Sequence, residues 1–176
     1  NLNTSVNSLT DALVEDNSIY IGNDPSSTTN SAEYNVAVGV TALDAITSGD
    51  ANVAVGYSAL SANTGGHYNN AIGNRSLKSN TTGDYNTAMG NSSLRDNVSG
   101  SYNTAFGQAS LQNNTASNNV AFGHNSAIAN TSGTRNIAIG YKAYNAADQE
   151  DDNLAIGYDA LGGAIAGGVK NIAIGN

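Results

Sequence analysis

A unit of about 17 residues recurs along almost the whole of this 176-residue chain and limits what the chain can fold into. The motif Asn-x-Ala-x-Gly marks each unit, and a degenerate copy at residues 18–22 precedes nine well-formed ones, so ten copies cover residues 18–176. The nine motifs start at Asn35, Asn52, Asn69, Asn86, Asn103, Asn119, Asn136, Asn153 and Asn171. Internal periods of this kind indicate repeat architectures. Positions are numbered below from the motif Asn (position 1) to position 17.

The motif itself predicts a short strand. Apolar side chains alternate with Ala over positions 2–4 and are bounded by Asn and Gly, which is typical of a strand between two turns. A 17-residue unit is too short for helical repeats, which need about 33 residues or more. It fits one coil of a parallel β-solenoid whose coils stack at about 4.8 Å. We therefore predict an all-β fold, a parallel β-solenoid of about ten 17-residue coils.

The motif Asn residues are predicted to be structural. Stacking places equivalent side chains in rows, and Asn amides in such a row can bond along the stack, as they do in cross-β assemblies. Asn also tolerates the left-handed conformation at a corner, and Gly at position 5 can turn the chain out of the strand. We expect a structural ladder formed by Asn35, Asn52, Asn69, Asn86, Asn103, Asn119, Asn136, Asn153 and Asn171.

Large apolar residues are scarce, and this bears on assembly. Leu, Ile, Val and Phe make up 33 of the 176 residues, a share near the border at which chains fail to fold. A solenoid explains the scarcity, because each coil has few apolar positions. A row of Ala flanked by rows of Val and Ile would form a flat surface for packing against another chain. We expect a homotrimer, with a monomeric solenoid as the alternative and an end-to-end filament as a further possibility.

Charge and cysteine content exclude several classes of protein. The formal net charge is −8, with only six Lys and Arg, which disfavours a nucleic-acid partner because phosphate binding needs clustered cations. The chain has no Cys, hence no disulfide framework or thiolate zinc site. No apolar run is long enough to span a membrane. The chain begins at Asn1 without a signal-peptide pattern, and we expect a mature product or a fragment of a longer fibre.

The first 17 residues differ from the repeats. Leu2, Val6, Leu9 and Leu13 are spaced 4, 3 and 4 residues apart, which is an a/d stripe over two heptads. This predicts a short helical or coiled-coil neck at residues 1–17, followed by the solenoid domain at 18–176. A short globular amphipathic helix is the alternative interpretation.

The run from Asn52 to Leu60, Asn-Val-Ala-Val-Gly-Tyr-Ser-Ala-Leu, resembles the head repeats of trimeric autotransporter adhesins. That resemblance implies a left-handed parallel β-roll that assembles as a trimer, although the unit here is longer than is usual in the family. The longer unit, with links such as residues 47–50 and 64–66, looks closer to repeats in tail fibres of marine tailed phages. The entry segments 9–13 and 18–22 are similar to the same fibres.

Catalytic and cofactor sites find little support in the sequence, and we predict none. The densest charge cluster offers a weak candidate for calcium at Asp148, Glu150, Asp151 and Asp152, since hard cations take several carboxylate oxygens. A solvated loop is the favoured interpretation, because the cluster lacks the glycine turn and ligand alternation of a calcium loop. His67 and His124 fall at different positions of their units and are expected at the surface.

Two further sets of polar and aromatic residues recur. Tyr occupies position 17 at residues 34, 68, 85 and 102 and position 6 at residues 57, 141 and 158. These rows are interpreted as braces between coils, with sugar binding as the alternative. Glycosylation sequons at Asn80, Asn91, Asn97, Asn113 and Asn130 are expected by chance in so Asn-rich a chain.

These observations predict a non-enzymatic structural fibre or adhesin segment. It would be a stiff rod on a cell exterior or virion that displays loops toward a glycan or protein receptor. The alternative is an ice-binding β-solenoid, for which Thr at position 2 of only two units is a short array. A carbohydrate-cleaving tailspike needs paired carboxylates, but Asp44, Asp96 and Asp159 do not recur at one position in neighbouring coils.

Overall fold

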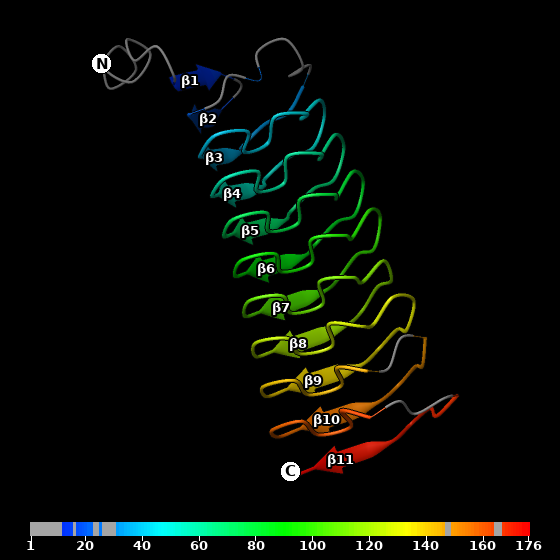
Figure 1. Cartoon of the computed structure of the whole chain (residues 1–176). Coiled ribbons are helices and arrows are strands. Elements are labelled where there is room, and N and C mark those ends of the chain that lie inside the picture. The colour runs from blue at the N-terminus through cyan, green and yellow to red at the C-terminus, as the bar shows by residue number, and fades with distance from the viewer. Residues whose placement is uncertain (1–11, 16, 23–24, 26–30, 147–148, 164–166) are drawn as a thin grey trace.

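The fold is a single stack of strands, seen in a computed structural model that describes residues 12–15, 17–22, 25, 31–146, 149–163 and 167–176 (Figure 1). Eleven short strands form one sheet in chain order. They are β1 Ala12–Glu15, β2 Ser18–Ile21, β3 Val36–Val38, β4 Val53–Val55, β5 Asn70–Ile72, β6 Thr87–Met89, β7 Thr104–Phe106, β8 Val120–Phe122, β9 Ile137–Ile139, β10 Leu154–Ile156 and β11 Ile172–Ile174. The described residues contain no helix.

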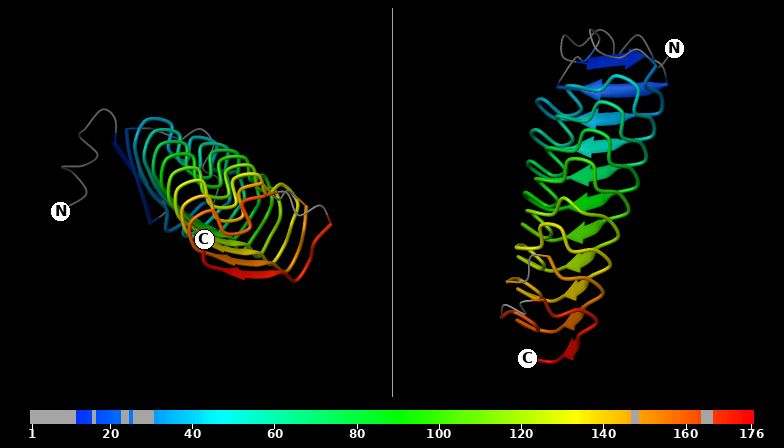
Figure 2. Two further views of the ribbon diagram at one scale, coloured as in Figure 1. Left: turned by 60° about the horizontal axis from the view of Figure 1, so that its bottom comes forward. Right: turned by 90° about the vertical axis from the view of Figure 1, so that its right-hand side faces the viewer.

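Strands β2 to β11 run parallel and in strict register (Figure 2). Each motif Ala pairs with the Ala of the next coil, as Ala37 does with Ala54. The predicted all-β parallel solenoid is confirmed. Residues 35–171 make about eight turns of about 17 residues, fewer than the ten predicted from motif copies. Ten strands bound only nine turns, and the turn between β2 and β3 includes residues outside the described set.

The N-terminal end of the stack is a hairpin rather than a helix. Strand β1 pairs antiparallel with β2, with Ala12 opposite Ile21 and Glu15 opposite Ser18. Asn17, in the turn between them, has φ 58°, the left-handed conformation that Asn tolerates. The predicted helical neck is therefore wrong for residues 12–15, because strand pairing with β2 overrides the heptad spacing. Residues 1–11 and 16 lie outside the described residues.

Left-handed backbone conformations shape every coil. Positions 7, 9 and 17 repeatedly have φ near 50–60°, as in Ser92, Leu94 and Tyr85. The Gly at position 5 is required by close approach as well as by φ. At Gly73, φ is 136° and a Cβ would lie 2.5 Å from the carbonyl oxygen of Gly90 in the next coil. The backbones of successive coils therefore pass one another too closely at this corner for any side chain.

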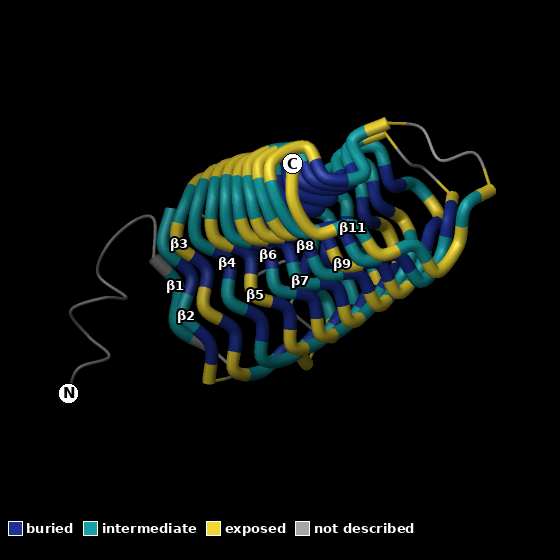
Figure 3. Tube along the Cα trace, turned by 90° about the horizontal axis from the view of Figure 1, so that it is seen from below, coloured by how far each residue is buried: buried dark blue, intermediate teal, exposed yellow. Residues whose placement is uncertain are grey.

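The interior of the coil is lined by small side chains. The motif Ala at position 3 is buried in every strand from β3 to β10, and the residues at positions 8 and 9, such as Ser76 and Leu77, are buried opposite it. Figure 3 looks along the stack and shows the buried segments recurring at the same places in successive coils. The Ala row was expected on an outer packing surface, but it faces inward. Positions 2 and 4 face outward instead.

The motif Asn side chains bond along the interior. From Asn52 to Asn171, the backbone N–H of each motif Asn donates to Oδ1 of the Asn one coil earlier, at 2.9–3.0 Å. Their Nδ2 groups donate to carbonyl oxygens at the far corner of the coil, as Asn86 does to Gly100 at 2.8 Å. Because such polar groups are costly to bury unpaired, this ladder explains why Asn occupies the site in every unit.

A second Asn ladder runs at position 12. In four of its coils, Nδ2 of the position-12 Asn donates to the carbonyl at position 15, as Asn80 does to Gly83 at 3.0 Å; in the 16-residue coil Asn114 donates to Ala116 at position 14. This ladder comprises Asn63, Asn80, Asn97, Asn114 and Asn130. The ladder breaks between Asn97 and Asn114, where the 16-residue coil 103–118 begins: the buried Oδ1 of Asn97 has no hydrogen-bond partner, and Asn114 Nδ2 donates to Ala116 O at 2.8 Å.

Candidate functional site: the outward faces of the stack

The outward face of the sheet is an uncharged, largely apolar surface. It is formed by positions 2 and 4 of the nine strands from β3 to β11, here called the sheet face, and none of its 18 side chains is charged or buried. Val38, Ile72 and Ile139 are each 38–39% exposed, and Phe106 is 43% exposed. Monomeric soluble proteins rarely expose contiguous apolar patches of more than about 300–600 Å². Nine strands at about 4.8 Å make this face about 40 Å long, so it exceeds what an isolated rod needs to expose.

Aromatic rings stack at both edges of the sheet face. At position 17, Tyr68, Tyr85 and Tyr102 stack at centroid distances of 4.9 and 5.2 Å, with interplanar angles of 9° and 5°. At position 6, His124, Tyr141 and Tyr158 are separated by 5.5 and 5.2 Å. A sugar binds an aromatic side chain by lying on the ring face. Tyr85 and Tyr141 have a ring stacked on both faces, and the rings beside them have one face covered, so the geometry of these two triplets favours bracing over sugar binding.

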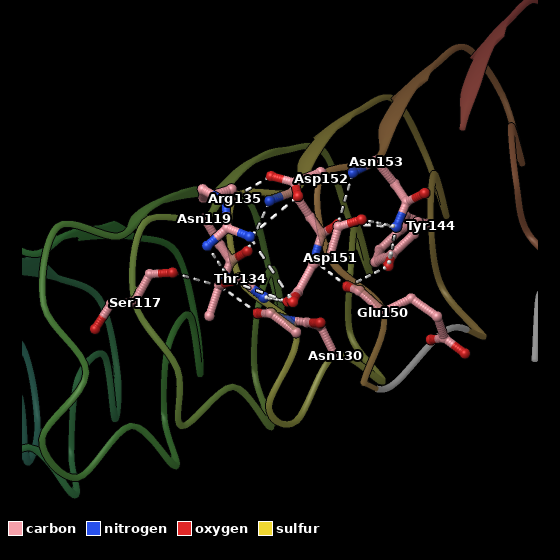
Figure 4. A network of polar contacts seen from close by, with 12 residues as sticks. Ser117, Asn119, Asn130, Thr134, Arg135, Tyr144, Glu150, Asp151, Asp152 and Asn153 are labelled. Carbon is pink, nitrogen blue, oxygen red and sulfur yellow. Dashed lines mark hydrogen bonds and ion pairs between the residues drawn. The ribbon is translucent and has the colours of Figure 1, made fainter. Parts of the chain in front are cut away.

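The acidic cluster is divided among different partners (Figure 4). Oδ1 of Asp151 accepts hydrogen bonds from the backbone N–H and the hydroxyl of Thr134, at 2.7 and 2.9 Å. Asp152 forms a two-point ion pair with Arg135. The carboxylate of Glu150 accepts from the backbone N–H groups of Gln149 and Gly167. Asp148 lies outside the described residues, and among those described no group of three or more acidic or histidine side chains is arranged to hold a metal ion.

Hydrogen bonding sets the protonation behaviour of this cluster. The bonds from Thr134, first from its N–H and then from its hydroxyl, lower the pKa of Asp151. The hydrogen bond from Arg135 lowers the pKa of Asp152, and the same pair raises the pKa of Arg135. Both carboxylates are therefore charged at neutral pH and act as acceptors that join one coil to the next.

Position 16 forms a column of acceptors that the sequence analysis missed. In most coils its backbone N–H donates to the side chain at position 16 of the following coil, because the left-handed residue at position 17 interrupts strand pairing there. Asp50 N–H donates to His67 Nδ1 at 3.0 Å, and His67 N–H donates to Asp84 Oδ1 at 2.7 Å. Ser101, Ser117 and Asp151 accept in the same way. His67 thus belongs to a structural column, while His124 stacks on Tyr141.

The second Asn ladder changes the meaning of the sequons. Asn80, Asn97 and Asn130 are fully buried members of that ladder, so the folded chain does not present them for modification. Asn91 is exposed and Asn113 half-buried. The recurrence of Asn at position 12 in five successive units was a readable signal for this ladder. Three of these five residues, Asn80, Asn97 and Asn130, also match a short modification motif, and that interpretation hid the ladder.

In coil 136–152, which follows the coil of Asn130, Tyr144 takes over part of the role of a ladder Asn. Position 12 of that unit is Ala147, and the buried hydroxyl of Tyr144 donates to the carbonyl of Glu150 at 2.9 Å. Glu150 is at position 15, whose carbonyl is bound by an Asn amide in the preceding coils. Tyr144 also accepts from Asn153 Nδ2 at 3.0 Å. The hydroxyl of Tyr144, from the Leu position, thus binds the position-15 carbonyl in place of the missing Asn, whereas the buried Oδ1 of Asn130 has no hydrogen-bond partner.

Comparison with family models, curated proteins and solved structures finds no match for this chain. Within the described part of the chain, no helix has the length and apolarity needed to cross a membrane. The functional argument therefore depends on the geometry of the stack and on the chemistry of its surfaces.

Proposed function

We propose that this chain is a non-enzymatic structural segment, a stiff rod in a fibre or adhesin on a cell exterior or virion. The observation that carries the proposal is the uninterrupted stack: parallel pairing in register from β2 to β11, with an Asn ladder bonded from Asn35 to Asn171. Every coil is tied to the next by backbone and side-chain hydrogen bonds. Such an object resists bending along its length, which suits a spacer.

The polar edge of the rod is the part suited to display. Positions 13 and 14 turn around the far corner of each coil, and Ser48, Thr82, Ser99 and Ser132 are exposed there. Loop positions accept substitutions and insertions more readily than strands. Both changes in unit length lie between position 9 and the next motif. We propose that contacts with a surface glycan or protein receptor are made from this edge.

Assembly is part of the same proposal. In the five coils that begin at residues 52, 69, 86, 103 and 119, the buried side chains at positions 3, 8, 9, 1 and 12 are an Ala, two small or medium residues and two Asn, while two apolar columns stay outside. A homotrimer of left-handed β-rolls, as the resemblance to adhesin heads and tail fibres implies, would cover those columns around a shared axis. Three-residue strands are narrow, about 10 Å wide, so three sheet faces can meet around one axis.

Ice binding has less support. An ice-binding surface needs a regular array of small side chains, whereas the sheet face mixes Val, Asn, Thr, Met, Phe and Ile. Thermal hysteresis of purified protein would reverse this ranking.

Shape and mass in solution test the proposal. Negative-stain microscopy and small-angle scattering are expected to give rods about 45 Å long, since ten strands stack at about 4.8 Å. Light scattering after size exclusion is expected to give three times 17.8 kDa. A longest dimension well below about 45 Å would contradict the stack of ten strands, and a stable monomer would contradict the trimer while leaving the stack intact.

A further inference from the structure

The tyrosine column at position 17 has a gap one residue wide. From the start of the stack, the column consists of Tyr34, Ala51, Tyr68, Tyr85 and Tyr102. Tyr34, Ala51 and Tyr68 share the left-handed backbone conformation, with φ of 61°, 55° and 56°. The backbone N–H groups of Ala51 and Tyr68 donate to the position-16 carbonyls of the preceding coils, at 2.9 and 3.0 Å. The Cα–Cβ bonds of the three residues therefore point the same way at successive levels of the stack.

The ring faces on either side of this gap are open. Tyr68 stacks on Tyr85 through one face, and Tyr34 stacks on no ring among the described residues. Tyr34 is 61% exposed and Tyr68 is 51% exposed. The two residues are separated by two coils, about 9.6 Å. A ring held at the level of Ala51 would therefore lie about 4.8 Å from each of them, close to the spacing within the stacked part of the column.

One donor and one acceptor lie beside the gap, at position 16. His67 Nδ1 accepts from the Asp50 N–H at 3.0 Å, so the neutral imidazole carries its proton on Nε2. Asp50 Oδ1 accepts from the Glu33 N–H at 2.9 Å, whereas Oδ2 lies 3.6 Å from His67 Nδ1. Both side chains are 38% exposed, and within the described chain neither His67 Nε2 nor Asp50 Oδ2 has a hydrogen-bond partner. The gap thus combines two apolar ring faces with a free donor and a free acceptor.

We infer that this gap binds an uncharged pyranose whose ring substituents are all equatorial, such as a β-glucoside or an N-acetyl-β-glucosaminide. Such a sugar has axial C–H groups on both faces, and these match the negative faces of Tyr34 and Tyr68. Its hydroxyls project from the rim, where they can accept from His67 Nε2 and donate to Asp50 Oδ2. The site lies away from positions 13 and 14, the edge proposed for receptor contacts, and it does not depend on assembly of the chain.

Thickness and charge select among the possible guests. Carbon atoms in contact lie about 3.5–4.0 Å apart, so a flat ring that touches both tyrosines spans about 7–8 Å of the available 9.6 Å or so. A puckered sugar ring with hydrogens on both faces is thicker and fills the gap better. Glu33, Asp50 and Asp84 occupy position 16, and no Lys or Arg occurs at position 16 or 17 before Arg135. Acidic sugars are therefore disfavoured by like charge.

Saturation-transfer NMR with simple methyl glycosides tests the class of ligand. Methyl β-glucoside and methyl N-acetyl-β-glucosaminide are expected to bind with dissociation constants on the order of 1 mM, and the ring signals of Tyr34 and Tyr68 should shift together. Methyl β-galactoside has an axial hydroxyl that would meet one ring, so it should bind about three to ten times more weakly. Absence of binding by the first two sugars, or equal binding by the galactoside, would overturn the inference. Phenol or tetramethylammonium binding at these tyrosines in place of the sugars would overturn it too.

A variant that fills the gap tests the location of the site. Ala51→Tyr adds a ring on a backbone conformation that Tyr68 already adopts, so it should keep the far-UV circular dichroism of the parent and lose sugar binding. Asn118→Tyr is the matched control, because it adds a ring at position 17 next to Tyr102 and away from the gap; it should leave binding unchanged. Tyr34→Leu removes one ring without filling the gap and should also weaken binding. Equal affinity in Ala51→Tyr and the parent would refute the site, whereas the mass and length of the same samples test the proposed rod separately.

Discussion

Removal of one ladder amide should destabilise the stack far more than removal of an identical surface amide. The side chain of Asn86 takes part in four hydrogen bonds. Its Nδ2 donates to Asn69 Oδ1 at 3.1 Å and to Gly100 O at 2.8 Å. Its Oδ1 accepts from the N–H and Nδ2 of Asn103 at 3.0 and 3.1 Å. Asn86→Ala removes all four.

The expected loss of stability depends on which hydrogen bonds the neighbouring groups keep in Asn86→Ala. Gly100 O keeps the bond from Asn97, Asn69 Oδ1 keeps the bond from the Asn86 N–H, and Asn103 Nδ2 keeps Ala116 O. The Asn103 N–H alone loses its acceptor. A buried unsatisfied group costs about 1–3 kcal/mol, and each other lost bond costs about 0.5–1 kcal/mol net. The expected loss is about 3–5 kcal/mol, and Asn86→Asp should cost more, because it sets an oxygen against two acceptors.

Asn74→Ala is the matched control, since Asn74 is an exposed Asn in the neighbouring coil; it should change stability by less than about 0.5 kcal/mol. Urea unfolding followed by circular dichroism, at equal protein concentration, gives the comparison. Repeat arrays can unfold in parts, so hydrogen exchange of the segment around residues 86–103 should accompany it. Equal midpoints for Asn86→Ala and Asn74→Ala would show that the ladder does not stabilise the coil as argued.

Three further perturbations probe other parts of the coil. Gly73→Ala should cost about 3 kcal/mol or more in urea unfolding, because φ 136° is nearly restricted to Gly and its Cβ would meet backbone. The matched Gly65→Ala, where a Cβ meets nothing closer than 3.5 Å, should be close to neutral; equal effects would exclude the close-approach argument. Tyr144→Phe should cost about 1 kcal/mol, the net worth of one buried hydroxyl hydrogen bond, and a neutral result would show that the hydroxyl does not replace the missing Asn. The pKa of Asp151 is lowered in the folded chain, so its contribution is present above the ordinary pKa of about 3.9 and is lost as pH falls through the lower folded value. Exchange protection at Thr134 should therefore drop as the pH falls below the ordinary carboxyl pKa and through the lower folded value, and Asp151→Asn, which keeps the acceptor but does not titrate, should abolish this dependence; the same drop in that variant would point to another group.

The period of the sequence predicted the stack well, because register and chain reach leave few alternatives. A strand of three residues in every 17 can pair with its successor in only one register if Ala is to meet Ala. Which side of the strand faces inward was not predictable from alternation alone. Alternation of side chains defines two faces of the strand but does not show which face is buried, and Val and Ile are ordinarily the core residues. Here the hydroxyl of Ser76, at position 8, donates to the carbonyl of Ala88 at 2.9 Å, so the opposite wall of the coil lies close to the strand and a small side chain fits at position 3.

The hairpin at the N-terminal end was missed for a related reason. The spacing of Leu9 and Leu13 fits a helical stripe, but Leu13 lies on a strand opposite Tyr20. Once a solenoid offers an open edge, pairing with that edge outweighs a two-heptad stripe, because a short helix is marginal in water. The residues Asp16 and Asn17 between two apolar runs were the signal for a turn. The position-16 column had no such signal, since Asp, His, Ser and Thr share only the ability to accept a hydrogen bond.

The choice of Ala for the interior explains both the thin core and the apolar exterior. Position 3 is Ala in every coil from β3 to β10, so the larger side chains at positions 2 and 4 stay outside and remain about 40% exposed, as Ile139 and Phe106 are. Full burial of such a side chain is worth about 1.5–3 kcal/mol, so covering the remaining exposure at two positions contributes about 1–2 kcal/mol per coil. Association carries a fixed cost of about 4–15 kcal/mol. Two or three coils therefore cannot offset that cost, whereas the nine strands of the sheet face supply about 10–20 kcal/mol. Assembly should thus depend steeply on the number of coils, which gives a repeat protein of this kind a physical reason to be long.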